Sequence, residues 1–194
     1  EDGPTNQPIE HMAMLRSLPN YNVFRPCDTR ETAAGWYTAL TSKTTPTGLV
    51  LSRQNLPALE GTGKGALKGA YVLKDCEGTP DVLLMASGSE VELIYKAYDE
   101  LAAKGVKARV ISMPCWELYE AQDAEYKESV MPKAVRARLA VEAAADFGWH
   151  KYVGMDGDII CMDGFGASAP AGLLFKDFGF TVENVVEKAL ALVK

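Results

Sequence analysis

The chain has 194 residues, of which 47% are hydrophobic and 24% charged, a composition typical of a globular protein with a buried core. Its formal net charge of −6 argues against nucleic acid and against an anionic membrane surface as partners. Apolar runs such as 82–86 have the length of a strand, so no membrane-spanning segment is expected. The four cysteines lack the paired spacing of metal or redox motifs, which favours a reducing, cytoplasmic setting.

The first quarter of the chain alternates between helical and strand patterns. Pro8 is placed for the first turn of a helix, and residues 21–24 read as a strand. Asp28 and Glu31 then have the spacing of a capping box, with aspartate in place of the usual serine or threonine. One face of the helix that follows carries the apolar side chains Ala33, Trp36, Tyr37 and Leu40. A short buried strand over 48–52 completes a helix-strand-helix-strand order.

Residues 56–68 differ in composition from the segments on either side and are interpreted as an interdomain linker. Glycine recurs in and just after this stretch, at positions 61, 63, 65 and 69. The sequence Gly63-Lys64-Gly65 has some likeness to a phosphate-binding loop. However, no serine or threonine follows the lysine and no helical pattern comes next, so the linker interpretation is favoured.

A second alternation runs from Tyr71 to the end of the chain. Strands are predicted at 71–74, 82–87, 108–113, 137–142 and 158–162. The clearest helix spans 90–104, with Ser89 and Glu92 as a capping box and Gly105 as its stop. A last helix begins near Val182, and Thr181 is its expected cap. Strands separated by helices predict a mostly parallel five-stranded sheet covered on both faces, a three-layer αβα sandwich.

Three short segments have some likeness to functional motifs, and each has a simpler interpretation. The turn 87–89 presents amides that could bind an anion, but one glycine is too few for a dinucleotide fingerprint, so helix capping is favoured. Asp156 and Asn184 only loosely fit a thiamine diphosphate metal motif, because Met155 stands where its first glycine belongs; a turn is favoured. His150 is expected to have a packing or surface role.

Arg53 is a stronger candidate for a binding residue. It leaves a buried strand within the segment 52–57, and the carboxyl ends of strands in parallel sheets are where ligands bind. Its planar guanidinium suits a phosphate or a carboxylate. On spacing alone, a structural salt bridge is nearly as good an interpretation.

Seven motifs in chain order resemble the transketolase family. The first two, Glu-Asp-Gly-Pro-Thr-x-Gln-Pro and Leu-Ser-Arg-Gln-Asn-Leu-Pro, are quite specific to transketolases among thiamine diphosphate enzymes. The motifs lie at 1–8, 51–57, 69–75, 87–91, 125–132, 165–170 and 178–181. The resemblance therefore covers essentially the whole chain.

This resemblance implies a function in ketol transfer. Transketolases move a two-carbon ketol unit from a ketose phosphate to an aldose phosphate, using thiamine diphosphate with Mg²⁺ or Ca²⁺. They have diphosphate-binding, pyrimidine-binding and C-terminal domains and act as homodimers. By this likeness, 1–55 is an incomplete pyrimidine-binding domain, 56–68 a linker and 69–194 a C-terminal domain.

The resemblance also implies three substrate-binding residues. Asp2 matches the aspartate that hydrogen-bonds a substrate hydroxyl, and Arg53 matches the arginine that binds the sugar phosphate. Asn6 stands where the family usually has a histidine, and an amide hydrogen-bonds but carries no charge near neutral pH.

The metal motif, the diphosphate contacts and the catalytic glutamate of the family are not found in this sequence. The chain is therefore expected to be a portion of a longer enzyme, cut by design or by proteolysis. On its own it is expected to bind neither thiamine diphosphate nor a metal ion, to be inactive, and to depend on the missing N-terminal part.

Two alternatives remain open. The region 69–194 contains nothing that looks catalytic, so it is compatible with a non-catalytic assembly or binding domain of another thiamine diphosphate enzyme. A deoxyxylulose phosphate synthase relative is the weaker alternative, because the Ser-Arg-Gln-Asn-Leu-Pro segment favours a transketolase.

Overall fold

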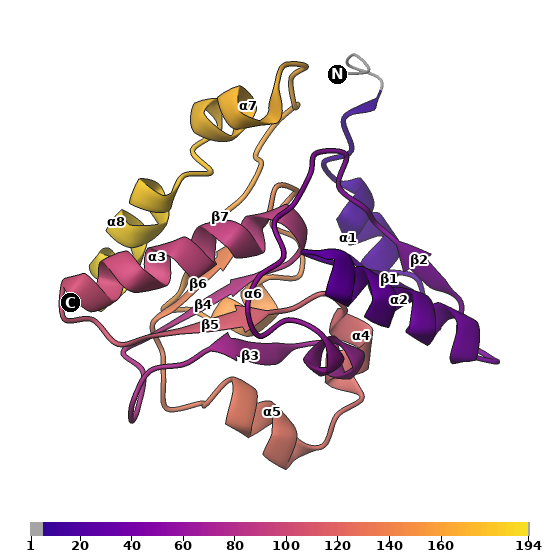
Figure 1. Ribbon diagram of the computed structural model, residues 1–194, viewed down its shortest axis with the longest axis horizontal. Helices are drawn as coiled ribbons and strands as arrows, with labels where there is room; N and C mark the ends of the chain where they lie inside the picture. The colour runs from indigo at the N-terminus through magenta and orange to yellow at the C-terminus, as the bar shows by residue number, and fades with distance from the viewer. Residues whose placement is uncertain (1–5, 194) are drawn as a thin grey trace.

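Two separate β-sheets organise the chain, one of two strands and one of five (Figure 1). The computed structural model describes residues 6–193. The smaller sheet lies within the run α1 (His11–Arg16), β1 (Asn22–Phe24), α2 (Thr29–Thr41) and β2 (Thr47–Leu49). The 3₁₀ helix η2 (Lys64–Lys68) follows, and then the elements of the larger sheet: β3 (Tyr71–Lys74), β4 (Val82–Ala86), η3 (Gly88–Glu90), α3 (Val91–Ala103), β5 (Ala108–Ser112), α4 (Trp116–Glu120), α5 (Ala124–Val130), β6 (Arg138–Val141), α6 (His150–Val153), β7 (Asp158–Ile160), α7 (Ala171–Asp177) and α8 (Val182–Leu192).

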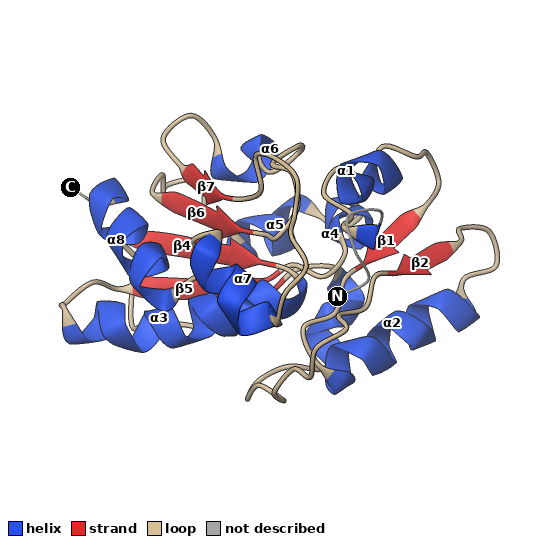
Figure 2. Ribbon diagram, turned by 90° about the horizontal axis from the view of Figure 1, so that it is seen from above, coloured by secondary structure: helices blue, strands red, loops and turns tan. Residues whose placement is uncertain are grey.

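The larger sheet confirms the predicted three-layer sandwich. Its strand order is β3-β5-β4-β6-β7, in which only β3 runs antiparallel to its neighbour. Helices α3 and α8 pack together over one face, and α4, α5 and α6 lie toward the other (Figure 2). All five strands begin and end within two residues of their predicted bounds.

Alternation along the central strands explains why both faces are covered. In β4, Leu84 packs in the cluster beneath α3 and α8, whereas Leu83 and Met85 pack on the opposite face with Trp149. All of these side chains are fully buried. A strand with apolar residues on both faces requires a helical layer on each side, as parallel sheets usually have.

The cap of α2 is only partly the predicted one. The Asp28 carboxylate accepts a hydrogen bond from the Glu31 backbone N–H at 2.9 Å, as expected. The returning bond, however, joins the Glu31 carboxylate to the N–H of Cys27 instead of Asp28. Helix α1 also begins three residues later than Pro8, at His11.

The apolar stripe of α2 faces outward. Trp36, Tyr37 and Leu40 are 52%, 60% and 79% exposed, while the opposite face buries Ala34 and Gly35. Strand β2 likewise differs from the expected buried strand 48–52, because it is shorter and only half-buried. Its outer edge pairs with no other strand among residues 6–193. This part of the chain therefore presents both an apolar helix face and an unpaired strand edge.

Caps were predicted for α3 and α8, the two long helices that pack on the larger sheet, and only one of these predictions is confirmed. Thr181 caps α8 as predicted, because its hydroxyl accepts a hydrogen bond from the Asn184 backbone N–H. The predicted Ser89–Glu92 capping box is wrong. Ser89 lies inside η3, and its hydroxyl donates to the Glu90 carboxylate, so it does not accept a bond from the helix N-terminus. Gly105 does end α3, with a φ of 78°.

The connection between the sheets is packed against α2. The Asp28 carboxylate accepts hydrogen bonds from the Leu59 backbone N–H and from the Thr62 hydroxyl. Leu59 is buried, and the Arg30 guanidinium donates to its carbonyl oxygen. These contacts fix the direction in which the chain leaves the smaller sheet.

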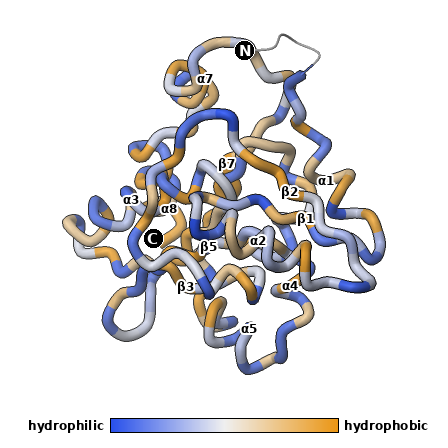
Figure 3. Tube along the Cα trace, turned by 45° about the vertical axis from the view of Figure 1, so that its right-hand side comes forward, coloured by the Kyte–Doolittle hydropathy of each residue, from blue (hydrophilic) through white to orange (hydrophobic). Residues whose placement is uncertain are grey.

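Hydrophobic stretches along the chain are short and alternate with hydrophilic ones (Figure 3). Within residues 6–193, no helix combines the length and apolar character needed to cross a membrane.

A buried ion-pair network joins the two sheets. Its centre is Glu142, a fully buried residue just after β6. Arg16 of α1 donates two hydrogen bonds to this carboxylate, at 2.6 and 2.8 Å. Ser87 and the Trp149 indole N–H donate to it as well, at 2.5 and 2.7 Å. The Arg16 guanidinium also lies 3.7 Å from the ring centroid of Trp116, which adds a cation–π contact.

A second arginine also joins the segment of the smaller sheet to the larger sheet. Arg25, just after β1, donates to the buried Glu90 carboxylate and to the Ser87 carbonyl oxygen, at 2.5 and 2.6 Å. Its own backbone N–H donates to the Pro114 carbonyl, and its carbonyl accepts from the Gly88 N–H. Burial alone would lower the pKa of Arg25, but the carboxylates of Glu90 and Glu142 outweigh burial and raise it.

A third acidic side chain, Glu31 of α2, projects toward the larger sheet. Its partners among residues 6–193 are hydrogen-bond donors and include no cationic side chain. Its carboxylate accepts hydrogen bonds from Tyr71 and Ser112, at 2.8 and 2.6 Å. Burial raises the pKa of Glu31, although these donors act in the opposite direction. Glu31 and Glu142 therefore respond to pH with opposite signs.

The network predicts a specific loss of stability in acid. Burial acts to raise the pKa of Glu142, but the charges of Arg16 and Arg25 and the hydrogen bonds to it outweigh burial, so its pKa falls from 4.5 to about 2. A lowered carboxyl pKa stabilises the fold above the unfolded-state value, and this stability is lost as pH falls toward 2. Its size is on the order of 3 kcal/mol.

We expect Glu142→Gln to be less stable than the parent protein at neutral pH, by roughly 3–5 kcal/mol, because Arg16 loses its charged partner and Arg25 loses one of its two nearby carboxylates. The deficit should shrink as pH falls from about 4.5 toward 2. Urea unfolding of both proteins at pH 6, 4 and 3 measures this, and the contribution of Glu31 cancels in the comparison. A deficit that does not change with pH would contradict the assignment of the acid response to Glu142.

Candidate functional site

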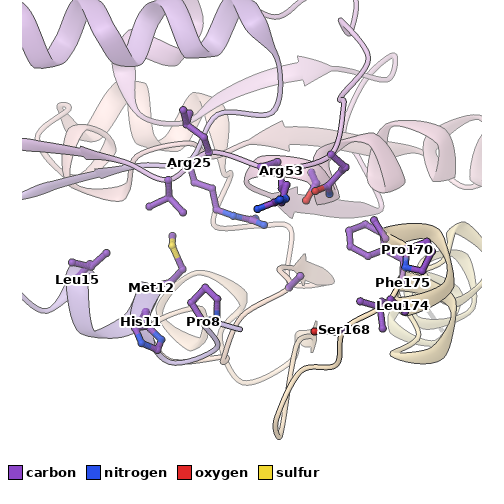
Figure 4. Close-up of a pocket in the computed structure, with 18 residues that line it drawn as sticks. Pro8, His11, Met12, Leu15, Arg25, Arg53, Ser168, Pro170, Leu174 and Phe175 are labelled. Carbon is purple, nitrogen blue, oxygen red and sulfur yellow. The ribbon is translucent and has the colours of Figure 1, made fainter. Parts of the chain in front are cut away.

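A cavity of about 990 Å³ lies at the carboxyl end of β2. It opens between the segment that contains the smaller sheet and the segment that contains the larger sheet. Helix α1, the segment that leaves β2, and α7 with the loop before it supply different walls (Figure 4). The cavity is lined by Pro8, His11, Met12, Leu15, Arg25, Val50, Leu51, Ser52, Arg53, Gln54, Ser89, Ala143, Ser168, Ala169, Pro170, Ala171, Leu174 and Phe175. Its size lies within the range of small-molecule sites.

The two arginines on the cavity wall have different environments. The guanidinium of Arg25 is about nine-tenths buried and contacts Glu90, so its charge is already balanced inside the protein. Arg53 has an exposed side chain and reaches the cavity from the carboxyl end of β2, as the sequence predicted. Of these two arginines, Arg53 is the one whose side chain is exposed at the cavity.

The other two predicted substrate residues are less fully described. Asp2 lies outside the described residues. Asn6 is exposed and directly precedes Gln7 and Pro8, of which Pro8 lines the cavity. The structure thus brings the segment carrying Asn6 and the segment carrying Arg53 to the same cavity, although they are 47 residues apart in sequence.

The turn 87–89 does not have the favoured capping role. The Ser87 hydroxyl donates to Glu142, and the Gly88 N–H donates to the carbonyl of Arg25. Both serine hydroxyls of this turn and the Gly88 amide are therefore used within the protein, and the Gly88 bond joins the turn to the segment after β1.

The remaining motif interpretations agree with the structure. His150 is exposed, and its Nε2 lies 3.0 Å from a carboxylate oxygen of Asp146, four residues earlier in the chain. Asp156 pairs with Arg136 at the surface. The side-chain amide of Asn184 donates to the Gly179 carbonyl at the start of α8.

The described residues do not fit a thiamine diphosphate–metal site. No group of three or more His, Cys, Asp or Glu side chains within 6–193 is arranged to hold a metal ion. In the glycine turn 87–89 that opens α3, the Ser87 hydroxyl and the Gly88 amide donate to protein acceptors. No chemical step is therefore derived through that cofactor from these residues.

Sequence reasoning missed the ionic residues behind the cavity and the wall that α7 supplies. One signal was available for Glu142, a carboxylate at the end of the apolar strand pattern 138–141, where a charge requires a partner. The identity of that partner, Arg16, depends on a contact across 126 residues and has no local signature.

Comparison with known proteins gives the family. The family model for the pyrimidine-binding domain of transketolase matches residues 1–58. The model for the transketolase-like C-terminal domain matches residues 69–181, more than half of the chain. This chain belongs to the transketolase family.

Individual relatives agree with that assignment. Transketolase 1 of Escherichia coli is 54% identical over 196 residues, which cover all of this chain and 30% of the relative. A transketolase from Leishmania mexicana superposes with a TM-score of 0.94 at 46% identity, covering all of this chain and 28% of the other. A Pichia stipitis transketolase in complex with sedoheptulose 7-phosphate gives 0.93 and 44%, with the same coverage. The chain thus spans about 30% of the length of these relatives.

The turn 87–89 provides a test of how tightly the larger sheet's segment packs against Arg25. Gly88 has a φ of 59°, and a Cβ added there would lie 2.6 Å from the Arg25 guanidinium carbon. Gly105 has a similar φ of 78° with nothing within 4 Å of an added Cβ. Alanine at either position adds backbone strain of roughly 1–2 kcal/mol, but only at Gly88 does it also displace the ion pair.

We therefore expect Gly88→Ala to destabilise the protein by about 1–3 kcal/mol more than Gly105→Ala. Urea unfolding of the two variants gives the difference directly, because the strain common to both cancels. Equal losses of unfolding free energy in the two variants would mean that the Arg25–Glu90 pair adapts to the added methyl group. The packing of Arg25 against the turn 87–89 would then be looser than described.

Proposed function

We propose that this chain is the C-terminal portion of a transketolase, which transfers a two-carbon ketol unit from a ketose phosphate to an aldose phosphate. In this proposal Arg53 binds the sugar phosphate, and Asp2 and Asn6 hydrogen-bond substrate oxygens. Residues 1–55 are part of the pyrimidine-binding domain, 56–68 connect the domains, and 69–194 are the C-terminal domain. The whole enzyme uses thiamine diphosphate with Mg²⁺ or Ca²⁺ in the cytoplasm.

The observation that carries the proposal is the position of Arg53. Its exposed side chain lines a cavity at the carboxyl end of a parallel strand, where ligands of such sheets bind. The planar guanidinium of Arg53 suits a doubly charged phosphate and is exposed at the cavity, whereas Arg25 is buried against Glu90. The sugar phosphate in the Pichia stipitis relative is in keeping with such a substrate.

The partners proposed for this chain are the remaining N-terminal part of the enzyme and a second subunit. The exposed apolar face of α2 supports this, because Trp36, Tyr37 and Leu40 form a surface of the kind that marks interaction sites. The unpaired outer edge of β2 supports it as well, since a two-stranded sheet is marginally stable by itself. The chain's coverage of only 30% of its relatives agrees with a missing part.

The C-terminal domain has a structural role in this proposal. Its buried carboxylates, Glu90 and Glu142, neutralise Arg25 and Arg16 and so hold the smaller sheet in place. The alternative, an assembly domain of another thiamine diphosphate enzyme, would leave Arg53 without a substrate to bind. The kinetics of Arg53 variants therefore separate the two.

In the full-length enzyme, we expect Arg53→Ala to weaken phosphorylated substrates far more than their unphosphorylated analogues. A charge-assisted hydrogen bond contributes about 1.5–3 kcal/mol, so KM should rise roughly ten- to a hundredfold. The effect on kcat should be smaller, because the phosphate is remote from the bond that breaks. Steady-state kinetics with both substrate types measure the split.

Arg136→Ala is a suitable control, because Arg136 is an exposed arginine paired with Asp156 far from the cavity lining. It should leave both KM values unchanged. An equal loss for both substrate types in Arg53→Ala would show that Arg53 has a structural role, and the assignment of the phosphate site would fail.

The isolated chain, by contrast, should bind neither thiamine diphosphate nor Mg²⁺ appreciably. The physical reason is the lack of a fitting ligand group among residues 6–193. Titration calorimetry should detect no binding tighter than about 100 μM, which corresponds to about −5.5 kcal/mol. Tighter binding would mean that the chain itself contains a cofactor site.

A further inference from the structure

The loop before α7 contacts the segment that carries Asn6. With its amide oriented to satisfy every neighbour, Gln7 donates from Nε2 to the Gly166 carbonyl at 2.8 Å. Its Oε1 accepts from the Ser168 hydroxyl at 2.8 Å and from the Ser168 backbone N–H at 3.3 Å. The Gln7 side chain thus makes three hydrogen bonds to the loop before α7, where Ser168 lies 161 residues further along the chain.

The same segment has a second attachment two residues on. The Ile9 carbonyl accepts a hydrogen bond from the Ala145 backbone N–H at 3.0 Å, and the Ile9 side chain is buried. At Gly166, an added Cβ would lie 3.3 Å from the Gln7 Cβ, so the two backbones approach closely. Together these contacts hold the backbone on both sides of Pro8, a residue of the cavity wall.

The loop also forms part of the cavity in which Arg53 lies. Ser168 and Pro170 line it, followed by Leu174 and Phe175 of α7, on a different wall from Arg53 (Figure 4). The loop therefore has two geometric consequences: it holds the segment that begins at Asn6, and it limits the space in front of Arg53.

We propose that Gln7 and Ser168 are positioning residues, through which the C-terminal domain sets the place of the Asn6 segment in the substrate site. This inference rests on the proposed function, because it concerns the site of Arg53 and Asn6. It gives the C-terminal domain a part in substrate binding in addition to its scaffold role. Neither residue has to touch the substrate, since Gln7 acts through the adjacent backbone.

Four variants of the full-length enzyme test the proposal: Gln7→Ala, Ser168→Ala, Ser168→Thr and the double variant Gln7→Ala/Ser168→Ala. Gln7→Ala should lower kcat/KM about tenfold, equally for phosphorylated and unphosphorylated donors, because it displaces the segment and leaves Arg53 in place. Ser168→Ala should lose less, about threefold, because its backbone N–H remains. Ser168→Thr keeps the hydroxyl and should restore nearly full activity.

The double variant tests whether the two residues act together. If Gln7 acts by contacting Ser168, removing both should cost no more than removing Gln7 alone. Hydrogen exchange of the Ala145 amide, which donates to the Ile9 carbonyl, should quicken in Gln7→Ala, a readout that does not depend on turnover. Gln122→Ala is the matched control, because Gln122 also donates to a backbone carbonyl but lies away from the cavity lining.

Three results would overturn the proposal: unchanged kcat/KM in Gln7→Ala, multiplicative losses in the double variant, or unchanged exchange of the Ala145 amide. If Gln7→Ala does not fold, the comparison of Ser168→Ala with Ser168→Thr decides in its place. Failure of the phosphate site is distinguishable, because it appears as a non-selective Arg53→Ala whatever the Gln7 variant does.

Discussion

The structure depends on the buried carboxylate of Glu142, which bonds Arg16 and lies 3.8 Å from Arg25. An unpaired charge at that depth would destabilise the fold by several kcal/mol, so the two arginines and the carboxylate require one another. Arg16 lies in α1 and Arg25 just after β1, so both come from the segment that contains the smaller sheet, whose two strands would be marginal alone. The network therefore does more than join two folded units: it determines where α1, β1 and the end of β2 lie, and hence where the cavity opens.

Local patterns predicted most of the fold. The five strands of the larger sheet and helices α3 and α8 were recognisable because each has its own periodicity or punctuation, such as Thr181 before α8 and Gly105 after α3. The errors occurred where long-range contacts prevail over local signals. Ser89 would cap α3 in isolation, yet it bonds Glu90, whose carboxylate is held by Arg25. The outward stripe of α2 had a correct helical period, but periodicity does not reveal which side faces the protein.

In the candidate site, too, some features could be predicted from the sequence and others could not. Arg53 was predictable, because it follows a strand in a polar segment and its motif resembles that of a known family. The different environments of Arg25 and Arg53 were not, since they depend on Arg25 being buried against Glu90 while Arg53 is exposed. The contact of Gln7 with Gly166 and Ser168 was equally hidden, because it joins positions at opposite ends of the sequence. Resemblance supplied the candidate residues, while the structure showed that Arg25 is buried against Glu90 and that Arg53 lines the cavity.

The most direct test of the account is a crystal structure of the full-length enzyme with a bound sugar phosphate. We expect the phosphate oxygens within hydrogen-bond distance of the Arg53 guanidinium, with Arg25 still paired to Glu90 and Gln7 still bonded to the loop of Ser168. A phosphate bound elsewhere, with its oxygens out of reach of the Arg53 guanidinium, would contradict the claim that this chain supplies the phosphate site.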